Sequence, residues 1–130
     1  MNILKGTIVS IKQSENLMLV FMDVEGELFN SLLLDGEKNH FEVGMDVHLL
    51  FKETEVTLAT TSSIVSERNA FCSKITHIEN GKILSSITLD FLGNDINAII
   101  TKGALHGLKC KVGDEFLWVV KANEVTLQPM

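Results

Sequence analysis

The sequence predicts an all-β protein made of two copies of one small module. The first observation is an internal repeat, with a shift of 67 or 69 residues, in three pairs of segments: Lys5–Ile11 with Cys72–Ile78, Val43–Val47 with Val112–Phe116, and Phe51–Leu58 with Val120–Leu127. The second is the alternation of apolar and polar residues over several short runs, which is typical of half-buried antiparallel strands. Self-similarity at a fixed period indicates a repeated architecture, and one loop insertion explains the change of shift.

The first copy contains five short runs with strand character. Strands are expected over Ile3–Lys12, Leu17–Val24, Leu28–Leu34, Val47–Lys52 and Glu55–Ala59. The polar segment Gln13–Asn16 and the tripeptide Glu25–Glu27 predict the first two turns. The segment Asp35–His40 is polar and interrupted by a glycine, so it predicts a loop or one helical turn.

The second copy repeats this order with clearer alternation, as in Ile87, Leu89 and Phe91. Asn80-Gly81 and Gly93–Asp95 predict turns, because their residues tolerate positive φ. Thr101–Leu108 is the helical candidate, with Thr101 as the N-cap and Gly107 as the stop signal. Five strands and one short helix in roughly 60 residues predict a small OB-like barrel, twice, with one short helix each.

The expected domains are residues 1–61 and 65–130, joined by the polar linker Thr60–Ser63. A module of about 60 residues has a marginal core on its own. We therefore expect the two modules to share surface, exchange strands or assemble with further chains. A homo-oligomer, either a dimer or a trimer, follows as the expected state.

Composition and charge exclude several classes of protein. The 130 residues are 45% hydrophobic and 22% charged, as in an ordinary globular protein, with a net charge of -6. An acidic chain is a poor nucleic-acid binder on its own, because such binding depends on Lys and Arg. No signal-peptide pattern and no long apolar run is present, so no membrane contact and a cytoplasmic location are expected.

Neither metal chemistry nor catalysis is indicated. Cys72 and Cys110 form no C-x-x-C motif and are expected to be reduced structural thiols. The four histidines lack the spacing of a metal site, so no protein-ligated metal is expected. No nucleophile, base and orienting group occur at a convincing spacing, and the chain is not expected to be an enzyme.

The segment between the two copies carries chemistry suited to an anion. Ser66, Arg68 and Asn69 supply a hydroxyl, a planar cation and an amide outside any apolar periodicity. A tetrahedral dianion needs a site made only of donors, which such groups and backbone N–H groups provide. Thr101 at a helix start and Lys121 at a strand end are further candidates. Taken singly, each of these residues is also compatible with a solvated connector.

Four separated patches, in the same order, resemble the Mop or TOBE molybdate-binding domain. They are Ser66–Asn69, Ile100-Thr101, Val112–Glu115 and Val120–Val125. The resemblance covers the chain as two modules and implies an OB-like barrel, strand exchange between modules and subunit association. It also implies molybdate or tungstate as the bound ligand, held by Ser66, Arg68, Asn69, Thr101, Lys121 and the Ala122 amide.

The sequence also departs from the family pattern. Glu67 stands where the family has Ala, and the second hydroxyl of the family helix is Ala104 here. In the first module, Leu34 and Glu53 stand where the second has Thr101 and Ala122. The favoured function is a cytoplasmic oxyanion-binding protein for storage, buffering or sensing. The alternative is a ligand-free TOBE-type module for protein interaction or regulation.

Overall fold

The computed structural model describes residues 1–34 and 40–130, and its first antiparallel sheet is built mainly from the N-terminal half. Its strands are β1 (Asn2–Ser14), β2 (Leu17–Val24), β3 (Glu27–Leu34), β4 (Asp46–Phe51) and β10 (Thr126–Pro129). The order across this five-stranded sheet is β10-β4-β1-β2-β3. The sequence predicts the bounds of β2 correctly and those of β3 and β4 to within one residue.

The second antiparallel sheet has the same design. Its strands are β5 (Thr57–Ala59), β6 (Ala70–Asn80), β7 (Leu84–Phe91), β8 (Asn94–Thr101) and β9 (Glu115–Val119). The order is β5-β9-β6-β7-β8, so the two sheets correspond strand for strand. Two short 3₁₀ turns, η1 (Glu53–Glu55) and η2 (Ala122–Glu124), precede β5 and β10. Glu55, expected in a strand, belongs to η1.

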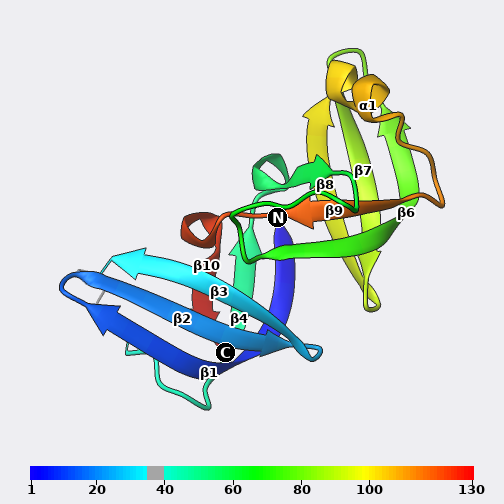
Figure 1. Ribbon diagram of the computed structural model, residues 1–130. Coiled ribbons are helices and arrows are strands. Elements are labelled where there is room, and N and C mark those ends of the chain that lie inside the picture. The colour runs from blue at the N-terminus through cyan, green and yellow to red at the C-terminus, as the bar shows by residue number, and fades with distance from the viewer. Residues whose placement is uncertain (35–39) are drawn as a thin grey trace.

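The two halves of the chain exchange their last strands. β5 pairs with β9 of the second sheet, and β10 pairs with β4 of the first sheet. In Figure 1, β10, drawn in red, lies among the blue and cyan strands of the first sheet. Each five-stranded sheet is complete only because the other half contributes one strand, so neither half of the chain contains a whole sheet.

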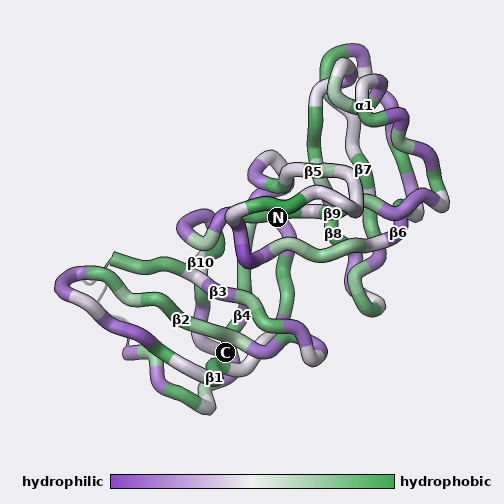
Figure 2. The backbone as a smooth tube through the Cα atoms, viewed as in Figure 1, coloured by the Kyte–Doolittle hydropathy of each residue, from purple (hydrophilic) through white to green (hydrophobic). Residues whose placement is uncertain are grey.

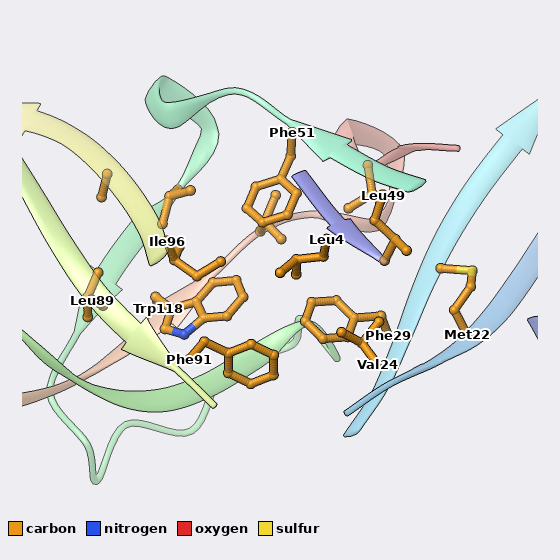
Figure 3. Packing of buried hydrophobic residues seen from close by; sticks show 14 of the residues in the cluster. Leu4, Met22, Val24, Phe29, Leu49, Phe51, Leu89, Phe91, Ile96 and Trp118 are labelled. Carbon is orange, nitrogen blue, oxygen red and sulfur yellow. The ribbon is translucent and has the colours of Figure 1, made fainter. Parts of the chain in front are cut away.

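The two sheets share a continuous hydrophobic core. Trp118 of β9 is fully buried, and its ring lies 6.0 Å from Phe29 of β3 and 5.3 Å from Phe91 of β7. Figure 3 shows these rings meeting between the sheets, with Phe51 and Leu4 beside them. Trp118 Nε1 donates to Ser73 Oγ at 2.9 Å, which satisfies its polar atom. Shared burial of this kind explains how two small modules form one stable unit.

Helix α1 (Lys102–Leu108) begins where the sequence predicts. The Thr101 side chain accepts a hydrogen bond from the Ala104 amide at 3.1 Å, as an N-cap does. The predicted stop at Gly107 is wrong, because Gly107 lies inside the helix and the left-handed residue is Lys109, with φ of 54°. The loop or helical turn predicted at Asp35–His40 in the first module lies, except for His40, outside the described residues.

The β7–β8 turn is two residues long and differs from its prediction. Leu92 and Gly93 have φ values of 51° and 90°, whereas Asn94 and Asp95 already pair with β7. The turn therefore precedes the predicted Gly93–Asp95 segment by one residue. Glu25 and Gly26 form the matching β2–β3 turn with φ values of 53° and 87°. Positive φ at both central residues is the geometry that twisted hairpins prefer.

Replacing Leu92 by asparagine is expected to stabilise the protein. Leucine is strained at positive φ, and this side chain is 55% exposed, so little packing is lost. We expect the free energy of unfolding to rise by about 0.5–1 kcal/mol, measured by chemical denaturation. Leu84→Asn, also at an exposed leucine but within a strand, is the control and should not stabilise. A lower free energy of unfolding for Leu92→Asn would contradict the argument.

Candidate functional site

The junction between the sheets is held by two reciprocal asparagine contacts. Asn69, fully buried just before β6, accepts a hydrogen bond from the Asn30 amide at 2.8 Å and donates to the Asn30 carbonyl at 2.9 Å. Asn2 makes the same pair of bonds to the backbone of Asn97, at 2.8 and 2.9 Å. Both pairs are related by the shift of 67 residues. The module repeat is thus a pseudo-twofold relation in space.

Other backbone contacts obey the same relation. The Ile8 amide donates to the Met45 carbonyl at 2.9 Å, and the Ile75 amide donates to the Asp114 carbonyl at 2.8 Å. β1 and β6 also carry register shifts at matching positions, between Ile8 and Ser10 and between Ile75 and His77. These contacts of the first module therefore have counterparts in the second.

Arg68 and Lys121 both lie next to the end of the pairing of β6 with β9. Ala70 is the partner of Val119, and the Val120 amide donates to the Asn69 carbonyl at 3.0 Å, which continues the pairing by one residue. Arg68 and Lys121 each lie one residue beyond this last backbone contact, and Arg68 is at a bend. Both residues are exposed, and neither side chain has a hydrogen bond or ion pair with any described residue. Ser66 precedes Arg68 by two residues and Ala122 follows Lys121, and these four residues are called the Arg68 group.

Asn69 belongs to the framework of this group. Its side-chain oxygen and nitrogen are both engaged with the backbone of Asn30, so the side chain points into the junction between the sheets. The segment that carries Ser66 and Arg68 is anchored at this residue. Sequence reasoning missed this clamp, although the matching Asn2 and Asn69, and Asn30 and Asn97, are visible in the shift of 67 residues.

Thr101 does not join the Arg68 group within the chain. It ends β8 and lines a pocket with Thr54 of η1 and Ala104 of α1, whereas η2, which follows Lys121, packs against β3. In Figure 1 the red turn before β10 lies well away from α1. The site residues predicted from the sequence are thus divided between two locations, one beside each 3₁₀ turn.

The first residue of η1, Glu53, carries a carboxylate that forms an ion pair. Glu53 Oε2 lies 2.6 Å from the amino group of Met1, and this hydrogen bond is the main reason that the pKa of Glu53 is lowered. The ionised Glu53 carboxylate stabilises the folded state. Its contribution to the free energy of unfolding is fully present above the pKa of Glu53 in the unfolded chain, and it is lost as the pH falls through the lower pKa of the folded protein. Glu53 is the counterpart of Ala122.

Cys72 and Cys110 are free thiols, and burial is the main cause of the raised pKa of Cys110, with Asp114 adding to it. A raised pKa keeps a thiol protonated and less nucleophilic. Over residues 1–34 and 40–130, no three His, Cys, Asp or Glu side chains are grouped to hold a metal ion. No helix in these ranges is long and apolar enough to cross a membrane.

Comparisons with known proteins identify the family of this chain. Residues 65–127 match the TOBE domain family. The cytoplasmic molybdate-binding protein ModG, in a crystal form with molybdate bound, superposes with a TM-score of 0.91 and 26% identity over 97% of this chain and 94% of its own. MopII from Clostridium pasteurianum, without ligand, is 30% identical over 45% of this chain and 90% of its own, with a TM-score of 0.44. No curated protein matches the sequence. The chain therefore belongs to the TOBE/Mop family of domains, in the tandem arrangement of ModG.

Proposed function

We propose that this protein binds molybdate or tungstate through the Arg68 group: the Ser66 hydroxyl, the Arg68 guanidinium, the Lys121 ammonium and the Ala122 amide. The observation that carries the proposal is the pairing of β6 with β9, whose last contact, between Asn69 and Val120, lies one residue from both Arg68 and Lys121. ModG, with the same tandem fold, binds molybdate, and this likeness supports the choice of ligand.

The chemistry of the group suits a tetrahedral dianion. Two cations that lack partners among the described residues are available without breaking an existing ion pair. A guanidinium offers two parallel N–H donors to one oxyanion, and an ammonium adds a point charge. Asn69 contributes as a positioning residue through its bonds to Asn30. In a protein of net charge -6, such a local concentration of donors favours a small anion over nucleic acid.

We further propose a binding role without catalysis, in storage, buffering or sensing of the oxyanion in the cytoplasm. The two functional modules correspond to residues 1–61 and 65–130, each completed by the exchanged strand of the other. The cytoplasmic location of ModG supports the compartment. Free thiols at Cys72 and Cys110 are consistent with a reducing environment.

Calorimetric titration of the protein, after removal of bound anions by dialysis, tests the proposal. Molybdate and tungstate should each bind with saturable heat, and sulfate should bind more weakly. A thermal unfolding curve should shift upward with molybdate, because a ligand that binds only the folded state raises its stability. Absence of both heat and shift with molybdate and tungstate, in folded protein, would sink the proposal.

A second candidate function, protein interaction, is favoured by an exposed apolar face on β2 and β3. Leu17, Leu28 and Leu34 are 42%, 52% and 64% exposed, and Leu17 pairs with Leu34 in the sheet. Figure 2 shows hydrophobic residues along β2. Because β3 is an edge strand, this face suits contact with another chain. We propose that it is covered by a second copy, in a dimer or trimer.

Light scattering coupled to size exclusion tests this assembly. The unaltered protein should have two or three times the mass of one chain, and Leu17→Glu/Leu28→Glu should have the mass of one, because buried charges without partners are costly. Ile83→Glu, at a site that is 77% exposed in the β6–β7 connection, is the matched control and should keep the oligomer. A monomeric parent protein, or an oligomeric double variant, would contradict the proposal.

A further inference from the structure

We propose that the Glu53 carboxylate closes a second oxyanion site, the counterpart of the Arg68 group in the first module, and thereby limits the number of anions bound per chain. This inference rests on the proposed function for the identity of the ligand. Its basis in the structure is the pseudo-twofold relation between the surroundings of η1 and η2.

The counterpart location is defined residue by residue. The shift of 69 residues relates Lys52 and Glu53 to Lys121 and Ala122, and both lysines have extended backbone, with φ of -74° and -67°. η1 packs against β8 as η2 packs against β3. The shift of 67 residues relates Met1 to Arg68, since the neighbouring Asn2 and Asn69 make the same contacts. The first module thus has a surface of the same design beside η1.

At this location the Glu53 carboxylate already pairs with a cation, as a bound anion would. The Met1 amino group is a cation at the residue that corresponds to Arg68, and it is 2.6 Å from Glu53 Oε2. Glu53 stands where the second module has Ala122, which carries no charge. A carboxylate and an oxyanion are both acceptors, and two negative charges at contact distance repel strongly. The internal carboxylate therefore takes the donor that an oxyanion would use.

The remaining groups beside η1 favour an anion once the carboxylate is removed. Lys52 is exposed, and its side chain has no hydrogen bond or ion pair with any described residue. Thr54, the next residue after Glu53 in η1, is exposed and adds a hydroxyl. Because a primary ammonium replaces the guanidinium, the opened site should bind more weakly than the Arg68 group.

The other acidic residues nearby do not explain the difference between the modules. Glu55 of η1 corresponds to Glu124 of η2, so both modules carry a carboxylate at that position. Glu53 and Ala122 differ, and Ala122 carries no charge. Glu55→Ala is therefore a matched control, because it removes the same charge from the same turn without opening the counterpart location.

Calorimetric titration with molybdate of the parent protein, Glu53→Ala and Glu55→Ala gives the direct test, with any purification tag at the C-terminus so that Met1 keeps its amino group. Glu53→Ala should gain one molybdate per chain, with an affinity about tenfold or more below that of the parent site. Glu55→Ala should bind like the parent. Glu53→Gln, which keeps the size of the side chain, should also gain a site and serves if the alanine variant does not fold.

The reciprocal variant Ala122→Glu extends the test to the second module. It should abolish binding at the Arg68 group, as Glu53 does in the first module. The inference and the proposed function fail separately. If the parent binds molybdate and neither Glu53 variant gains a site, the inference is wrong and the function stands. If the parent does not bind molybdate and Glu53→Ala does, the inference about Glu53 stands, and the Arg68 group is not a molybdate site. If no protein binds, both are wrong.

Discussion

Replacing Arg68 by alanine is expected to reduce molybdate affinity about 10- to 100-fold, and the Arg68→Ala/Lys121→Ala double variant should show no measurable binding. Each charge-assisted hydrogen bond contributes about 1.5–3 kcal/mol, and one tenfold change in affinity corresponds to about 1.4 kcal/mol. Calorimetric titration measures the effect. Arg68→Lys should recover only part of the affinity, because an ammonium cannot form two parallel bonds with one oxyanion.

The control for this experiment is Lys74→Ala, which removes one exposed cation from β6 at a distance from the inter-sheet junction. It should bind molybdate like the parent. Since Arg68 and Lys121 have no partners among the described residues, their replacement should leave the thermal unfolding temperature of the ligand-free protein nearly unchanged. Undiminished binding in the double variant would show that the oxyanion is held elsewhere.

Replacing Asn69 by alanine is expected to lower the free energy of unfolding by about 2–5 kcal/mol. The change removes two buried hydrogen bonds and leaves the amide and carbonyl of Asn30, which is 7% exposed, without these partners. Each unsatisfied buried group costs about 1–3 kcal/mol. Chemical denaturation followed by Trp118 fluorescence measures the loss, because Trp118 lies in the core that both sheets share.

Asn2→Ala is the matched comparison for Asn69→Ala. It removes the same two bonds, but Asn97 is more accessible to solvent than Asn30, so water can replace the lost partners more easily. We expect a smaller loss of stability. A loss below about 1 kcal/mol for Asn69→Ala would mean that the clamp does not hold the sheets together.

Much of the fold could be predicted because a half-buried strand has alternating apolar and polar residues in the sequence. Alternation of period two over Ile87–Phe91 predicts β7, and the apolar run Leu17–Val24 predicts β2. Thr101 is a recognisable N-cap because its hydroxyl and the Ala104 amide are only three residues apart. The β7–β8 turn was predicted one residue late, because leucine rarely occupies a positive φ and Leu92 gives no signal of its turn.

The candidate site could be predicted only in part. The family resemblance selects Ser66, Arg68, Lys121 and Ala122, which lie just beyond the end of the pairing of β6 with β9. It also selects Thr101 and Asn69, whose surroundings depend on contacts with the other module. The bond between Glu53 and the Met1 amine joins residues 52 positions apart, and no local pattern predicts it.

The sequence by itself determined the repeat, the β class, the strand periods and the chemical character of the Arg68 group, since all of these follow from neighbouring residues. Only the tertiary structure decided which sheet each final strand joins. Val56–Leu58 and Val125–Leu127 have the same residues, Val-Thr-Leu, so either could bury the same face in either sheet. Periodicity fixes which side chains are buried, whereas the partner strand depends on packing around Trp118 and on the two asparagine clamps.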